Sequence, residues 1–163
     1  MVNEKGLDNA IESAKKLTEN GKMRMRLDEA VSKSLELVES CNIAMVGSNG
    51  DNGYPNIKAM IKVEAEGIKT IWFSTNTSSK RVSKFMHNPK ACVYFADQDK
   101  FKGLMLVGDI EVLSDIESKK RLWCEGCEIY YPLGVNDPDY SVLRFTTKWG
   151  NYYHGLKNVS FDV

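Results

Sequence analysis

The sequence predicts a mainly β protein with flanking helices, folded as an antiparallel barrel. Short apolar or alternating segments follow one another through the chain, and tight turns rich in Asn and Gly separate them. This pattern is typical of strands that meander through one antiparallel sheet. The regular crossover helices that a parallel sheet requires are missing between these segments. We therefore expect five or six strands in one barrel, with short helices at its edges.

Length and composition favour one globular domain. The chain has 163 residues, of which 42% are hydrophobic and 27% are charged, as is usual for a globular protein. A chain of this size buries about 70% of its unfolded surface. The formal net charge is zero, which argues against whole-molecule electrostatic binding to nucleic acid or to an anionic membrane. Any function based on charge must be local.

The expected location is the cytoplasm. The first 17 residues contain charged side chains throughout and lack the apolar region of a signal peptide. No apolar run approaches the roughly 20 residues of a membrane-spanning helix. Four cysteines without an export signal predict free thiols in a reducing compartment.

Two amphipathic helices are expected at the start of the chain. Apolar residues recur at helical spacing over Leu7–Thr18, and Asn20-Gly21 is a plausible stop. The pattern repeats over Leu27–Ser40, where Asp28 is the expected N-cap. We expect residues 1–26 to form a helical extension of a single domain that spans residues 1–163.

The rest of the chain predicts strands and two further helices. Two Asn-Gly pairs between Ser48 and Gly53 favour the positive φ angles of a hairpin turn, and Glu66-Gly67 favours another turn. The strand candidates are Ile43–Val46, Asn56–Glu64, Ile68–Ser74, Ala91–Ala96, Leu104–Leu113 and Tyr140–Thr147. The helix candidates are Ser78–His87, which Asn88-Pro89 would end, and Asp115–Trp123.

A local basic region stands out in this neutral protein. No acidic residue occurs between Glu66 and Asp97, and the interval contains Lys69, Lys80, Arg81, Lys84 and Lys90. At its centre, residues 78–81 (Ser-Ser-Lys-Arg) begin the predicted helix. The free N–H groups and the dipole of a helix start favour an anion there.

The side chains around this helix start are those that a phosphate monoester needs. Hydroxyls of Thr75, Thr77, Ser78 or Ser79 can donate hydrogen bonds, and Lys80 adds a positive charge. The alternative is a Ser N-cap on an amphipathic helix whose basic face is solvated. Trp72 and Phe73 end the preceding strand, so a planar ligand could lie beside the bound phosphate.

Several short motifs together resemble a known family. They are Tyr54–Met60, Ile71–Thr75, Ser78–Lys80, Asn88-Pro89, Val107–Asp109 and Asp137–Tyr140. In this order and spacing they resemble the FMN-binding split barrel of the pyridoxamine 5'-phosphate oxidase-like superfamily, in particular its general stress protein branch. The resemblance extends from Asp28 to the end. It implies a split barrel, FMN as cofactor, a homodimer with the flavin at its interface, and oxidoreductase activity.

The resemblance also implies which residues bind the flavin. Lys58 would help to hold the phosphate, and the backbone of Met60, Ile61 and Lys62 would follow the edge of the isoalloxazine ring. Trp72, Phe73 and Ser74 would face the ring or the ribityl chain. Thr75, Ser79 and Lys80 match the phosphate cradle, with Ser78 possible instead of Ser79. Trp149 or Tyr153 would come from the other subunit, and Tyr153 is the better placed of the two.

Two departures from the family pattern affect the expected activity. Lys58 stands where Arg is frequent, which removes a bidentate phosphate contact. The C-terminal Arg-x-His element that holds substrate in true pyridoxamine phosphate oxidases is missing. A non-catalytic flavin-binding stress protein, or a split barrel that binds haem or a deazaflavin, are the alternatives. No catalytic residue and no substrate is predicted.

Cys124-Glu-Gly-Cys127 is a single C-x-x-C motif. A zinc site would need a second pair of ligands, and His87 and His154 lack the spacing to supply one. A thioredoxin-like role would need a βαβ context, which the sequence does not predict. We therefore expect no metal and two ordinary free thiols.

Overall fold

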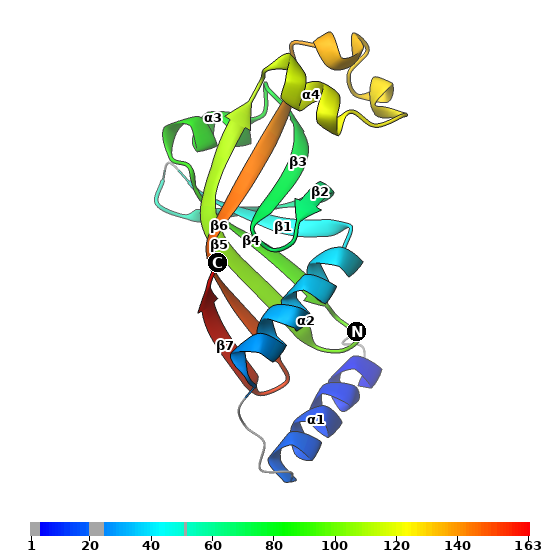
Figure 1. The fold of residues 1–163 in the computed structure, drawn as a ribbon, viewed down its shortest axis with the longest axis vertical. Helices are drawn as coiled ribbons and strands as arrows, with labels where there is room; N and C mark the ends of the chain where they lie inside the picture. Colours follow the sequence, from blue (N-terminus) through cyan, green and yellow to red (C-terminus); the bar gives the residue numbers. More distant parts are fainter. Residues whose placement is uncertain (1–3, 20–24, 51) are drawn as a thin grey trace.

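The computed structural model describes residues 4–19, 25–50 and 52–163. In this part of the chain, seven strands and four α-helices form (Figure 1). The strands are β1 (Ile43–Asn49), β2 (Pro55–Glu66), β3 (Thr70–Asn76), β4 (Lys90–Asp97), β5 (Lys102–Leu113), β6 (Tyr140–His154) and β7 (Lys157–Asp162). The helices are α1 (Glu4–Glu19), α2 (Leu27–Ser40), α3 (Lys80–His87) and α4 (Ile116–Leu122). Short 3-10 turns occupy Cys127–Ile129 and Gly134–Asn136.

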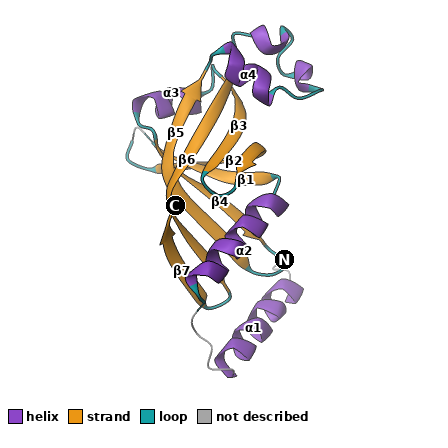
Figure 2. Cartoon of the chain, viewed as in Figure 1, coloured by secondary structure: helices purple, strands orange, loops and turns teal. Residues whose placement is uncertain are grey.

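The strands form one antiparallel sheet in the order β3-β2-β1-β4-β5-β6-β7. A further pairing between β3 and β6 closes the first six strands into a barrel, and β7 adds to β6 outside this ring. The predicted antiparallel barrel with flanking helices is confirmed. Figure 2 shows the long strands β5 and β6 running through both halves of the molecule, with the helices at its periphery.

Apolar side chains fill the barrel. Phe73, Phe95 and Phe145 are fully buried within one cluster that also receives Leu37 and Val38 from α2. Alternation along the strands explains this cluster, because every second residue of a strand points to the same face. Helix α2 therefore covers one end of the barrel with its apolar side.

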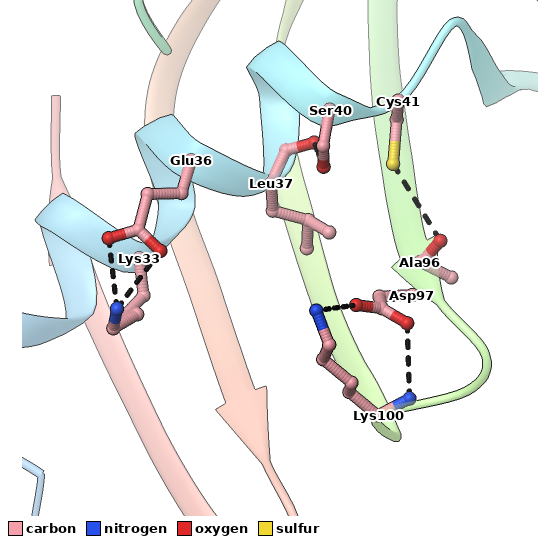
Figure 3. Close-up of polar contacts among 8 residues, drawn as sticks. All are labelled: Lys33, Glu36, Leu37, Ser40, Cys41, Ala96, Asp97 and Lys100. Carbon is pink, nitrogen blue, oxygen red and sulfur yellow. Dashed lines mark hydrogen bonds and ion pairs between the residues drawn. The ribbon is translucent and has the colours of Figure 1, made fainter.

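Polar contacts fix the C-terminal end of α2. The Lys62 ammonium donates hydrogen bonds to the carbonyls of Val38 and Glu39, which lack partners inside the helix. Just beyond the helix, the Cys41 thiol donates to the Ala96 carbonyl with 3.7 Å between sulfur and oxygen. Figure 3 shows this contact beside the ion pairs Lys33–Glu36 and Lys100–Asp97.

Two local expectations were wrong. Arg26, not Asp28, occupies the N-cap position of α2, and Asp28 lies in the first turn, where it pairs with Arg26. Of the two Asn-Gly pairs, Gly53 has the positive φ angle, 80°. Gly50 is needed for space, because a Cβ atom there would lie 2.3 Å from the Tyr54 carbonyl oxygen. Asn20-Gly21 lies outside the described residues.

The C-terminal hairpin is the largest difference from the predicted elements. The predicted strand 140–147 continues as β6 to His154, and β7 follows it. In β7, Val159 and Phe161 alternate with polar residues over only six positions, too short a run to identify a strand without its partner. In the described part of the chain, no helix is long and apolar enough to cross a membrane.

Candidate functional site

A half-open cavity of about 280 Å³ lies where β2 and β3 meet the start of α3 and the segment after α4. Its volume is close to the lower end of the range for small-molecule sites, roughly 300–1,000 Å³. Its lining is mostly apolar, with one cation among the described residues that line it. The lining residues are Ala59, Met60, Ile61, Val63, Ser74, Thr75, Asn76, Arg81, Cys124, Cys127, Tyr130 and Tyr131.

The cation of this cavity is Arg81. Its Nη1 donates to Thr75 Oγ1 at 3.3 Å and approaches Met60 Sδ at 3.3 Å. The side chain is half-buried, and this loss of solvent lowers the pKa of its guanidinium from the ordinary value. Arginine stays charged through such a shift, so a positive charge lines an otherwise apolar wall.

Two buried donors at the start of α3 lack hydrogen-bond partners. They are Arg81 Nε and Ser79 Oγ. Buried polar atoms in folded proteins nearly always have a partner, so such atoms indicate a ligand or an ordered water. Arg81 lines the cavity, and Ser79 stands two positions before it, at the N-cap of α3. The residues present therefore fit the phosphate of a flavin mononucleotide.

Asp139 holds the loop between β3 and α3 in place. Its carboxylate accepts hydrogen bonds from the Ser78 N–H at 2.6 Å, the Ser78 hydroxyl at 3.1 Å and Asn76 Nδ2 at 2.8 Å. The hydrogen bond from Asn76, followed by those from Ser78, lowers the pKa of Asp139. The Ser78 hydroxyl is thus already engaged within the protein, which leaves the Ser79 hydroxyl as the available donor.

An aromatic cluster supports the wall of the cavity beside Tyr131. Tyr131 and Tyr140 pack with ring centroids 4.6 Å apart, and Trp123 packs edge-on against Tyr140 at 5.3 Å. Burial, followed by nearby groups such as Tyr140, raises the pKa of Tyr131 to about 12. Tyr131 therefore stays neutral at physiological pH.

The structure brings only some of the predicted residues to this cavity. Four of them line it: Met60, Ile61, Ser74 and Thr75. Ser79 is not part of the lining; it occupies the N-cap position of α3, two residues before Arg81. Trp72 lies elsewhere, buried beneath the Arg121 guanidinium at 4.4 Å from its ring, and Phe73 belongs to the main core. Both residues lie earlier along β3 than Ser74 and Thr75, which stand near its end beside α3.

The predicted lysines do not line the cavity. Lys58 is exposed on β2 and Lys80 is exposed at the first position of α3, while the Lys62 side chain caps α2. Because each helical residue is turned by about 100° from the one before it, Arg81 and not Lys80 points to the cavity.

The two C-terminal aromatic candidates lie on the second half of β6. The Tyr153 hydroxyl shares a hydrogen bond of 2.8 Å with the Tyr94 hydroxyl, and Trp149 is 38% exposed. Neither residue lines the cavity of its own chain. Their predicted role on a partner's flavin stays a prediction.

Sequence reasoning missed the segment after α4. Cys124, Cys127, Tyr130 and Tyr131 line the cavity, although more than 45 positions separate them from β3 in the sequence. Only the C-x-x-C spacing marked this segment in advance. The expectation of free thiols there was wrong, because Cys124 and Cys127 form a disulfide, whereas Cys41 and Cys92 are free. Across the described ranges, no group of three or more His, Cys, Asp or Glu is placed to hold a metal.

The fold and the sequence match a known family. Residues 29–161 match the family model described as pyridoxamine 5'-phosphate oxidase like. No curated protein sequence matches the chain significantly.

Solved structures give the same result. A protein from Clostridium acetobutylicum, described as related to general stress protein 26 of Bacillus subtilis (pyridoxinephosphate oxidase family), is 58% identical. The alignment covers 82% of this chain and 94% of that one, with a TM-score of 0.76. General stress protein 26 from Bacillus anthracis shares the fold at 14% identity, with a TM-score of 0.68 and coverage of 82% and 98%. A heme binding protein from Mycobacterium smegmatis also shares it, at 15% identity, with a TM-score of 0.66 and coverage of 82% and 57%. The family model matches residues 29–161, which is most of this chain, and a relative that is 58% identical has the same fold. This chain therefore belongs to the pyridoxamine 5'-phosphate oxidase-like family.

Proposed function

We propose that this protein binds FMN in the cavity between β2, β3 and α3 and acts as a flavin-dependent oxidoreductase. The observation that carries the proposal is the pair of unpartnered buried donors at the start of α3, Ser79 Oγ and Arg81 Nε, of which Arg81 lines the largely apolar cavity. A phosphate satisfies both donors, and the apolar wall of Ala59, Ile61 and Val63 suits one side of a flat ring.

The chain's own residues divide the work at this site. Arg81 and Ser79 bind the phosphate, Thr75 orients the guanidinium, and Asp139 fixes the loop that carries these groups. The apolar residues of β2 exclude water from one face of the ring, which strengthens the polar contacts beside it. When bound, the isoalloxazine ring would supply electron or hydride transfer.

We further propose that two copies of the chain enclose the flavin. The outer face of β1 and β2 carries Ile43 opposite Ile61 and Met45 opposite Ala59, with Ile57 two positions further along β2. Ile43, Met45, Ile57 and Ile61 are 45–70% exposed in the single chain. Apolar patches of this kind mark interaction surfaces. Ala59 and Ile61 also line the cavity, so a second copy bound to this face would cover the open side of the site.

The absorbance spectrum of the purified protein tests the cofactor. A yellow protein whose acid-released cofactor comigrates with FMN is the expected result, since a second phosphate cradle for an adenylate is not evident among the described residues. A haem spectrum, or a colourless protein that also fails to bind added FMN, would overturn the proposal. If the flavin binds but cannot be reduced, the protein stores flavin and is not an oxidoreductase.

A further inference from the structure

The disulfide between Cys124 and Cys127 lies at the wall of the cavity. Both cysteines line the same space as Met60, Ile61, Ser74 and Thr75. Nothing in the proposed binding of FMN requires a thiol at this place. The two other cysteines of the chain, Cys41 and Cys92, are unpaired and do not line the cavity.

The backbone holds the two cysteines together independently of the bond between their sulfurs. The Cys127 N–H donates to the Cys124 carbonyl at 3.2 Å, and Gly126 has a φ angle of 89°, as the third position of a type II turn requires. The two Cα atoms are 5.7 Å apart, within the usual range for bridged cysteines. The turn can therefore persist when the disulfide is reduced, with both thiols still placed to close it again.

The two sulfurs have different surroundings. Cys124 is exposed, whereas Cys127 is half-buried and packs against the cluster that contains Trp72 and Tyr140. An accessible thiol can exchange with an outside dithiol or disulfide, and a shielded neighbour can then resolve the mixed disulfide.

Where the surroundings are reducing, a lasting structural disulfide is uncommon. Disulfides that do form there are usually catalytic or redox-sensing. A dithiol beside a flavin can reduce it directly, because the dithiol–disulfide couple and the flavin each exchange two electrons.

We propose that Cys124 and Cys127 are a redox-active pair that exchanges two electrons with the flavin in this cavity, an inference that rests on the proposed FMN site. In one direction the two S–H bonds break and one S–S bond forms. The two electrons and two protons released convert the oxidised flavin to its reduced form. In the other direction the reduced flavin opens the disulfide, and the exposed Cys124 is the thiol that passes the electrons to an outside disulfide.

The test approaches equilibrium from both sides without oxygen, on the full chain with one equivalent of FMN. One sample starts from protein whose cysteines have been reduced with dithiothreitol and freed of it, with oxidised FMN added. The other starts from the disulfide form with FMN that has been reduced by dithionite. Flavin absorbance is followed in both. N-ethylmaleimide labelling, read by mass spectrometry on the peptide that contains both cysteines, counts the thiols.

Both samples should reach the same flavin absorbance and the same fraction of labelled cysteine. In Cys124→Ser and Cys127→Ser the flavin should stay in the state in which it was added. Cys41→Ser is the matched control, since Ser can keep the hydrogen bond to Ala96, and it should behave as the unaltered chain does.

The outcomes separate the two proposals. If FMN binds but flavin and thiols keep their starting states, the redox pair is wrong and the FMN site stands. Equal loss of exchange in Cys41→Ser would also overturn the assignment to Cys124 and Cys127. If no FMN binds, both the proposed function and this exchange are wrong.

Discussion

The Arg81 guanidinium reaches back from the first turn of α3 and donates to Thr75 Oγ1, 3.3 Å away at the end of β3. This contact joins the end of β3 to the start of α3, the two elements beside the proposed phosphate position. Thr75 is 95% buried and lies opposite Ser141 of β6. The barrel closure between β3 and β6 therefore fixes the position of the cation.

Arg81→Ala should weaken FMN binding about ten- to a hundredfold, because loss of one charged hydrogen bond to a half-buried phosphate removes about 1.5–3 kcal/mol. Titration with flavin fluorescence measures it. Lys80→Ala is the matched control, and the exposed position of Lys80 predicts little change. From the sequence alone, the larger loss of FMN affinity is expected in Lys80→Ala. The two variants therefore distinguish a phosphate site at Arg81, proposed from the structure, from one at Lys80, predicted from the motif.

Ile57→Glu should convert the proposed dimer to a monomer. Ile57 is 62% exposed on the apolar face of β1 and β2, and a carboxylate buried without a partner in an interface opposes association. Light scattering at micromolar concentration gives the mass. Ile116→Glu, at the start of α4 and 39% exposed, should leave the mass unchanged. A dimer that survives Ile57→Glu would place the interface on another face.

Phe73→Ala should lower the free energy of unfolding by about 3–5 kcal/mol, as expected for truncation of a fully buried aromatic residue. Phe73 has no exposed surface and lies within the main core. Chemical denaturation measures the loss, and Leu156→Ala, at a 63% exposed position, should change it by less than about 0.5 kcal/mol. A direct role of Phe73 on the flavin would instead appear as weaker binding in the milder variant Phe73→Leu.

Acidification should loosen the cradle through Asp139. Its pKa is below the ordinary 3.8, chiefly because of the hydrogen bond from Asn76 and then those from Ser78. A carboxylate with a lowered pKa in the folded state contributes stability that is complete above its unfolded pKa. That stability is lost as the pH falls through the lower folded value.

The free energy of unfolding should therefore fall below about pH 4, and Asp139→Asn should reduce this dependence. Denaturant unfolding at a series of pH values measures it. Asp99→Asn, an exposed carboxylate outside the cradle, is the control. An unchanged pH dependence in Asp139→Asn would mean that the loop does not depend on this carboxylate.

Pyridoxamine 5'-phosphate should not be oxidised at a useful rate, although the flavin should be reducible by dithionite or NAD(P)H. The substrate carries its own phosphate, and Arg81 is the single cation among the described residues of the cavity. Without a second anchor the reacting atoms lose the advantage of fixed orientation, worth several kcal/mol of barrier. The test measures product formation from pyridoxamine 5'-phosphate in air, and in parallel the anaerobic loss of flavin absorbance on reduction. Saturable turnover would show that a substrate anchor exists outside this cavity.

The sequence by itself determined the barrel and the segment in which we propose the anion site. Alternation and turn residues are local signals, so the positions of β2, β4, β5 and α4 follow from them within a few residues. The start of α3 likewise follows, within a few residues, from the hydroxyl and basic residues at positions 75–81.

Only the tertiary structure decided which side chains meet. A motif of adjacent residues does not say which of Lys80 and Arg81 turns inward, because that depends on where the helix begins and how it packs on β5 and β1. The sequence also did not bring Cys124 and Cys127 to the cavity, since they reach it through the packing of the segment after α4 against Trp72 and Tyr140. Contacts between distant segments arise when the barrel closes, and no local pattern encodes them.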